Sequence, residues 1–169
     1  MPEPSQHAER RGAIEEFLRR IPGFKGYLEK QYRRDSDAMQ RQWLADRLVH
    51  GKQSLDDVTR ALVDAGQVDV LPPFDRVRAR LDKLIGRIRG AVRGYSGWFD
   101  LVQVDEALLD RIYKHDAKLA EQVDNLTNLI EPWRKKPAEA VAGLPSALEQ
   151  IDALDAEWDQ RDTILKGLD

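Results

Sequence analysis

The sequence predicts an all-α protein, an antiparallel helical bundle with a three-helix core and additional N-terminal helices. Apolar residues recur at intervals of three and four over most of the 169 residues, which is the spacing of one helix face. The chain contains no cysteine, so a disulfide framework, thiolate chemistry and cysteine-based metal sites are excluded. With 34% charged and 41% hydrophobic residues, the composition is typical of a single helical domain rather than of a disordered chain.

The clearest core helix is predicted from Asp75 to Gly94. Pro72 and Pro73 should prevent a helix from running in from upstream, and Asp75 can cap the first turn by accepting backbone N–H bonds. Six apolar residues at helical spacing form the expected core face: Val77, Leu81, Leu84, Ile85, Ile88 and Val92.

The opposite side of this helix carries glycine at every fourth position. Each glycine costs a helix about 0.5–1 kcal/mol relative to alanine, so three on one stripe suggest that another backbone or a ligand approaches closely. The alternative is a weakly stable exposed face. The candidate contact surface consists of the three glycines and the cations beside them: Gly86, Gly90, Gly94, Lys83, Arg87, Arg89 and Arg93.

A helix corner is predicted directly after this helix, over Gly94–Asp100. Its glycines permit positive φ, and its aromatic residues carry a large area for burial. We expect Trp98 and Phe99 to be buried in the core and to set the angle to the next helix; the alternative is an exposed aromatic tip that touches a partner or a membrane. The corner residues are Tyr95, Gly97, Trp98 and Phe99.

Two further core helices are predicted over Asp105–Glu131 and Ser146–Leu168, joined by a connector. Upstream, the N-terminal helical segment 5–66 should hold a short helix, a longer one closed by Gly51, and another short one ended by Gly66. Residues 67–74 are the predicted linker to the helical core 75–169.

No catalytic motif is present, so we expect neither an enzyme nor a cofactor. His7, His50 and His115 are far apart and lack the spacing of a metal site. Asp116 falls in the apolar seam of its helix, where an ionised carboxylate requires a partner. We predict a structural ion pair between Asp116 and an arginine of the helix over 75–94.

The charges are unevenly distributed, although the net charge is only −3. Residues 75–94 hold seven basic and two acidic residues, whereas residues 146–169 hold two basic and seven acidic ones. The expected function is a non-enzymatic protein–protein interaction or scaffold module, with a protein partner or self-association. The alternative is a binder of anionic surfaces, nucleic acid or lipid headgroups, through the basic residues Arg76, Arg80, Lys83, Arg87, Arg89 and Arg93.

Three stretches carry a resemblance: IPGFKGYLEKQYRRDSD (21–37), GYSGWFD (94–100) and VQVDEALLDRIYKHD (102–116). Together they resemble a family of small, uncharacterised bacterial helical proteins with a GYSGxFD-type helix corner. The resemblance implies a bacterial, cytoplasmic protein and carries over no activity. An association with membrane stress would fit the lipid-headgroup alternative. The sequence itself shows no transmembrane stretch and no apolar signal segment after Met1, which also predicts the cytoplasm.

Overall fold

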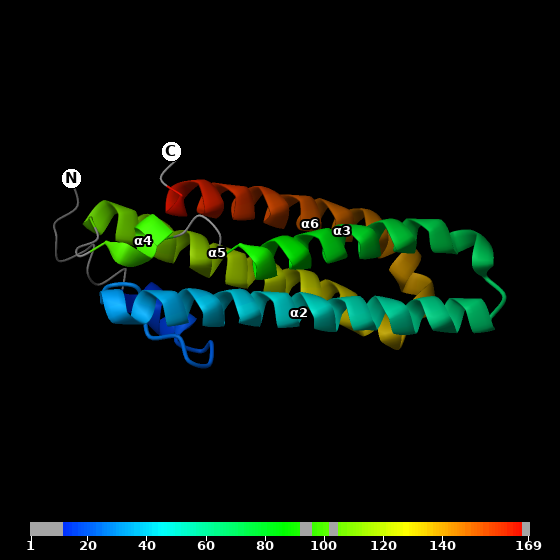
Figure 1. Ribbon diagram of the computed structural model, residues 1–169. Coiled ribbons are helices and arrows are strands. Elements are labelled where there is room, and N and C mark those ends of the chain that lie inside the picture. Colours follow the sequence, from blue (N-terminus) through cyan, green and yellow to red (C-terminus); the bar gives the residue numbers. More distant parts are fainter. Residues whose placement is uncertain (1–11, 92–95, 102–104, 167–169) are drawn as a thin grey trace, which may run out of the picture.

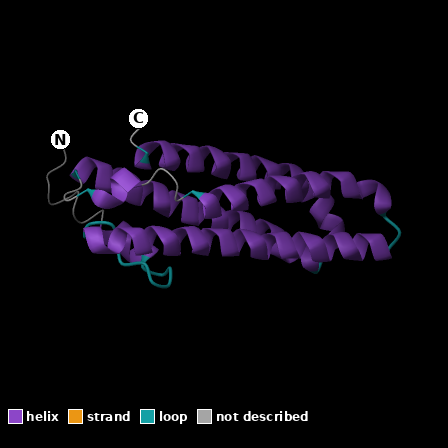
Figure 2. Ribbon diagram, viewed as in Figure 1, coloured by secondary structure: helices purple, strands orange, loops and turns teal. Residues whose placement is uncertain are grey.

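The computed structural model describes residues 12–91, 96–101 and 105–166. These residues form helices and loops, and the described part of the chain contains no strand (Figure 2), so the predicted all-α fold is confirmed. After a short helix over residues 12–18, the elements are α2 (Lys30–Asp64), η1 (Val68–Val70), α3 (Leu71–Gly90), α4 (Ser96–Asp100), α5 (Glu106–Ile130), η2 (Glu131–Arg134) and α6 (Pro137–Leu165).

The long helices α2, α3, α5 and α6 lie side by side (Figure 1), and ion pairs between them reveal their directions. Along α3 from Arg78 to Arg89, the partners step backward along α2 from Asp56 to Asp46, so α2 and α3 are antiparallel. The α3–α6 pair is parallel instead, because Arg80 meets Asp152 and Arg87 meets Asp159 with the same sequence offset of 72 residues.

The helices therefore occupy the corners of a square in the order α2, α3, α6, α5. Helix α3 contacts α2 and α6, and α5 contacts the same two helices, which places α3 and α5 on a diagonal. The chain must cross the end of the bundle to connect them, and α4 lies in this crossing (Figure 1). The predicted corner is thus a short helix that covers one end of the core.

The predicted three-helix core is too small, because α2 is also a core helix. Gly51 was expected to end a helix, but it lies inside α2, is buried and faces α5, with Ile130 Cδ1 4.0 Å from the position of a Cβ. A glycine inside a helix permits such a close approach of two helices. The longer helix that was expected from about Lys25 to Val49 begins later, at Lys30, and it is continuous with the short helix expected after it, so the two form one helix of 35 residues.

Of the three predicted core-helix starts, Asp105 is confirmed as the N-cap of α5, whereas Asp75 and Ser146 lie too far downstream. Helix α3 begins at Leu71 and includes Pro72 and Pro73 in its first turn, where a missing N–H removes no hydrogen bond, so Asp75 is not its N-cap. Helix α6 begins at Pro137 and continues through Pro145. Pro145 is exposed, so water can reach the carbonyl group that loses its helical partner.

Burial at the crossing agrees with the predicted corner. Trp98 and Phe99 are each only 3% exposed, so both are buried in the core. Gly97 is exposed and does not have positive φ, and Tyr95 lies outside the described residues. Tyr27 packs edge-on against Trp98, with ring centroids 5.7 Å apart, which joins the crossing to the segment before α2.

The segment before α2 packs on the bundle through a row of buried residues: Leu18, Ile21, Phe24 and Tyr27. Its Arg20 Nη2 lies 2.6 Å from Asp124 Oδ2 on α5. None of the described helices combines the length and the apolarity that crossing a bilayer requires.

Gly143 offers a test of the packing between η2 and α6. A Cβ at this position would overlap the ring of Trp133, which is 5% exposed and cannot move into solvent. We expect Gly143→Ala to lower the free energy of unfolding by about 1–3 kcal/mol because of this overlap. Urea denaturation measures the change.

Gly86→Ala is the matched control, because Gly86 is also helical and no described atom lies within 4 Å of its Cβ position. It should raise the free energy of unfolding by about 0.5–1 kcal/mol through helix propensity. Equal effects at the two glycines would contradict the described contact with Trp133.

Candidate functional site

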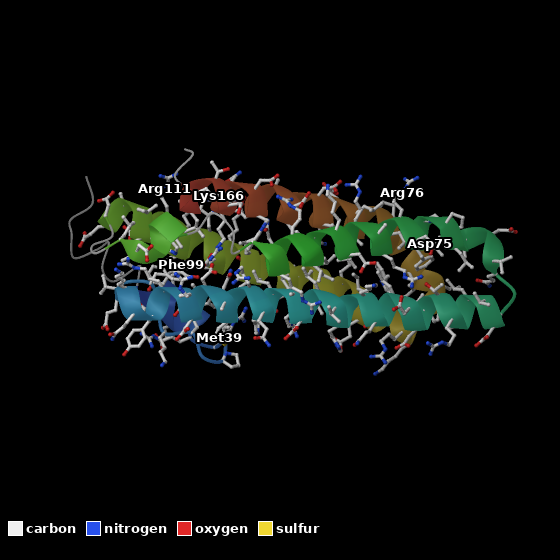
Figure 3. The ribbon with its side chains drawn as sticks, in the orientation of Figure 1. Met39, Asp75, Arg76, Phe99, Arg111 and Lys166 are labelled. Carbon is white, nitrogen blue, oxygen red and sulfur yellow. The ribbon has the colours of Figure 1, made fainter. Side chains whose placement is uncertain are left out.

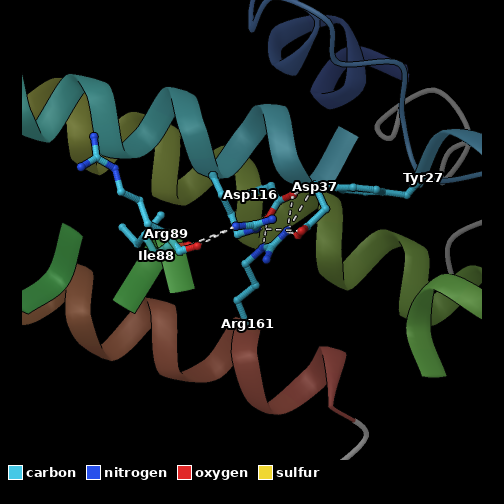
Figure 4. Close-up of polar contacts among 7 residues, drawn as sticks. Tyr27, Asp37, Ile88, Arg89, Asp116 and Arg161 are labelled. Carbon is cyan, nitrogen blue, oxygen red and sulfur yellow. Dashed lines mark hydrogen bonds and ion pairs between the residues drawn. The ribbon is translucent and has the colours of Figure 1, made fainter. Parts of the chain in front are cut away.

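The polar centre of the bundle is the guanidinium group of Arg161 on α6, which is fully buried. Its Nε lies 2.5 Å from Oδ1 of Asp116 on α5, and its Nη2 lies 2.9 Å from Oδ1 of Asp37 on α2. Both carboxylates are also fully buried (Figure 4). One arginine therefore joins three helices at the same level of the bundle.

Two neighbours extend this arrangement to the rest of the fold. Arg41 Nε donates to Asp37 Oδ2 at 2.8 Å, while its Nη1 donates to the carbonyl oxygens of Ile88 and Arg89 at 3.4 and 3.2 Å, near the end of α3. The hydroxyl group of Tyr27 donates to Asp116. We call these five side chains the charge cluster: Tyr27, Asp37, Arg41, Asp116 and Arg161.

The charge cluster is electrically balanced, with two carboxylates and two guanidinium groups. Burial raises the pKa of Asp116 above its ordinary value, and the charge and hydrogen bonding of Arg161, together with the hydrogen bond from the Tyr27 hydroxyl group, oppose this increase. Burial, together with the charge of Asp116, raises the pKa of Tyr27 well above its ordinary value. The phenol therefore keeps its proton and acts as a hydrogen-bond donor.

No substrate can reach this cluster in the folded state, because Asp37, Asp116, Arg161 and Tyr27 have no exposed surface. The side chains of the charge cluster hydrogen-bond to one another, and Arg41 also donates to the backbone of α3. What this arrangement can do is hold the helices in one register.

Asp116 does form an ion pair, but the prediction that its partner is an arginine of the helix over 75–94 is wrong. Asp116 is on α5, diagonally opposite α3, and α3 directs its arginines outward. The partner is Arg161, a second charged residue in an apolar seam.

The basic residues of α3 pair with carboxylates on both neighbouring helices. Arg80 Nη1 lies 2.5 Å from Asp152 Oδ1, and Arg87 contacts both Asp155 and Asp159, all on α6. Arg89 Nη2 lies 3.5 Å from Asp46 Oδ1 on α2. The basic helix thus faces the acidic helix along one edge, while Arg76 and Lys83 are exposed (Figure 3 shows Arg76).

The glycine stripe makes no contact inside the described part of the chain. Gly86 and Gly90 are exposed, and no atom lies within 4 Å of a Cβ placed on either. Gly94 and Arg93 lie outside the described residues. At Gly86 and Gly90, the close backbone approach expected from the glycine spacing is therefore not made by any helix that the structure describes.

A second buried cation, Arg33, was not predicted. It is fully buried on α2, and its guanidinium group lies 5.5 Å from the ring centre of Trp98. Nε donates to the carbonyl oxygen of Tyr27 at 2.7 Å, Nη2 donates to that of Leu28 at 3.1 Å, and Nη1 donates to that of Leu101. Burial lowers the pKa of Arg33. This side chain joins the loop before α2 to the loop after α4.

The two leucines held by Arg33 are exposed at one end of the bundle. The exposed fraction is 65% for Leu28 and 37% for Leu101. Next to Leu28, a surface depression is lined by the first turns of α2 and by Phe99 and Asp100 of α4 (Figure 3 labels Phe99). We call this surface the tip patch: Leu28, Lys30, Arg34, Phe99 and Leu101. Sequence reasoning missed it, since no periodic pattern indicates that two loops meet.

The two described histidines, His50 and His115, each lie next to a glutamate. His115 Nδ1 and Lys118 both contact Glu157, a 3% exposed carboxylate between α5 and α6. His50 Nε2 lies 3.8 Å from Glu131, and His7 lies outside the described residues. Across residues 12–91, 96–101 and 105–166, no three histidine or carboxylate side chains converge as metal ligands.

Comparisons with protein-family models, with curated proteins and with solved structures found no match for this chain. The resemblance to a family of bacterial helical proteins stays a prediction. The site must be interpreted from its own geometry.

The ion pair between Asp116 and Arg161 can be measured with a double-mutant cycle. Asp116→Leu alone should lower the free energy of unfolding by about 3–5 kcal/mol, because it leaves part of a buried guanidinium charge without its partner. The double variant Asp116→Leu/Arg161→Met should cost less than the sum of the single changes, since Asp37 and Arg41 still balance each other. Additive costs in urea denaturation would contradict this pairing.

Tyr113 predicts a loss of stability at alkaline pH. Burial raises its pKa from 10.0 to about 12, and Glu15 adds to the increase, while the N–H of Tyr27 donates to its hydroxyl oxygen and opposes it. The folded protein holds this proton more tightly than the unfolded chain does, so the stabilisation is complete below pH 10 and is lost as the pH rises toward 12. Denaturant unfolding over this range should show the decline. Tyr113→Phe should reduce its slope, and an unchanged slope would contradict the assignment.

Proposed function

We propose that this protein is a non-enzymatic protein–protein interaction module that binds its partner end-on through the tip patch. The observation that supports this proposal is that the buried side chain of Arg33 donates hydrogen bonds to the backbone carbonyl oxygens of two exposed leucines, Leu28 and Leu101. A buried cation is costly unless its donors are satisfied, and those of Arg33 are used to join these two loops.

The leucines can contribute substantially to binding. Burying a leucine side chain against a partner stabilises a complex by about 1.5–3 kcal/mol. Their backbone is already held by Arg33, so little conformational entropy is lost when a partner binds. A small preorganised apolar surface of this kind is suited to serve as the centre of an interface.

An enzymatic function has less support, because the buried charge cluster is closed to substrates. Binding of phosphates along α3 also has less support. A phosphate group near Arg80 or Arg87 would have to compete with the carboxylates of Asp152, Asp155 and Asp159, and the net charge is −3. The interaction module is therefore the function that the geometry favours.

Leu28→Asp tests the proposed surface. We expect it to weaken partner binding at least about tenfold, because it replaces an apolar contact by a charge that must be desolvated. The full chain, immobilised, would be used to capture partners from a lysate of its source, and each captured protein would then be purified and its Kd measured. Thermal unfolding should change little, because Leu28 is 65% exposed.

Val68→Asp is the matched control. Val68 is 54% exposed and precedes α3, at the opposite end of α2 from Leu28. A partner that binds the wild type and Val68→Asp equally, and Leu28→Asp weakly, supports the proposal. A partner whose Kd is unaffected by Leu28→Asp contradicts it.

A further inference from the structure

We propose that the tip patch recognises an acidic–aliphatic segment of a partner protein, in which a single Asp or Glu side chain lies next to an aliphatic one. This inference rests on the proposed interaction function and specifies its ligand. The carboxylate would lie between Lys30 and Arg34, and the aliphatic side chain would pack against Leu28 and Leu101.

Arg34 is arranged to bind a carboxylate. Its guanidinium group lies 4.5 Å from the ring centre of Phe99, which is itself buried and fixed in position. A guanidinium group held against an aromatic face keeps its N–H donors at the edge, where they match the two oxygens of a carboxylate. Arg34 is exposed and forms no ion pair with any residue that the structure describes, so these donors are available.

Lys30 adds a second positive charge on the same side of α2. It precedes Arg34 by four residues, which is one helical turn, and it too is exposed and has no ion-pair partner within the described ranges. Glu29 is the N-cap residue of α2, so its carboxylate already offsets the positive end of the helix dipole, and the attraction for a ligand comes from the two cationic side chains. A carboxylate near Lys30 and Arg34 therefore meets two positive charges.

The acidic residues around the depression limit the ligand to a single carboxylate. Glu29 accepts a hydrogen bond from the side chain of Gln31 at 3.0 Å, while Asp35 and Asp100 also line the depression. Asp35 follows Arg34 directly and so lies about 100° further around the helix. A run of acidic residues would place its other charges near Asp35 and Asp100, and like charges repel, so a lone acid beside an aliphatic residue fits best.

The other end of the bundle also exposes an apolar side chain, that of Val63, at 47%. The two cations beside Val63 are Arg60 and Arg78, and both form ion pairs with neighbouring aspartates. Lys30 and Arg34 form no ion pair with a residue that the structure describes. Apolar exposure and unpaired cations thus occur together at the tip patch.

The test is selection of 12-residue peptides from a random displayed library against the full chain, followed by fluorescence polarisation with the synthetic peptides. We expect the selected peptides to share one Asp or Glu within two positions of Leu, Ile, Val or Met. Arg34→Glu should weaken their binding at least about tenfold, and so should replacing the peptide acid by its amide, because each change removes a charge-assisted pair. A peptide carrying Lys in place of the acid should regain affinity for Arg34→Glu.

Arg76→Glu is the control for the charge reversal, because Arg76 is an exposed cation on α3 far along the chain from the tip patch. It should leave peptide binding unchanged. Peptides that lose affinity with Leu28→Asp but not with Arg34→Glu, or that share no acid, would overturn the acidic–aliphatic ligand and leave the interaction surface standing. If no selected peptide loses affinity with Leu28→Asp, both the ligand and the surface are wrong.

Discussion

The fold depends on the placement of one guanidinium group, that of Arg161, between two buried carboxylates. Removing charges from water is costly, and the attraction between them offsets this cost only where geometry and hydrogen bonding are good. Here Asp116 and Asp37 meet the requirement from two different helices, and Arg41 extends the cluster to the backbone of α3. A shift of α2, α5 or α6 by one turn would separate buried charges, so the cluster selects one register from the many that apolar residues alone would accept.

The same dependence explains which parts of the fold could be predicted from the sequence. Helical spacing of apolar residues identified the core faces of α3 and α5, because those faces follow from the chain alone. The positions of Asp116 and Arg161 in apolar seams were visible as well. Their pairing was not, since it requires knowing that α5 is adjacent to α6 and diagonal to α3. Opposite charges in two seams are a signal that could have found it.

Helix ends were harder to predict, because local stop signals were overridden by packing. Glycine often ends a helix, but Gly51 lies inside α2, where the lack of a side chain allows α2 to approach α5 closely near Ile130. Proline is common in the first turn of a helix, and Pro72 and Pro137 lie in the first turns of α3 and α6. The predicted starts, Asp75 and Ser146, lie later in the chain. The tip patch could not be predicted from the sequence, because its two loops are joined only by tertiary contacts with Arg33.

The diagonal step from α3 to α5 gives the tip patch an unusual property. Leu28 and Leu101 belong to segments that become neighbours only when α2 and the crossing through α4 are both in place. A fragment carrying one leucine would have half of the surface and no means of ordering it. Because any ligand of this surface binds the folded state and not the unfolded chain, its binding is thermodynamically linked to folding of the entire bundle. A partner would therefore bind only the intact folded molecule, and its binding would in turn stabilise that molecule against unfolding and degradation.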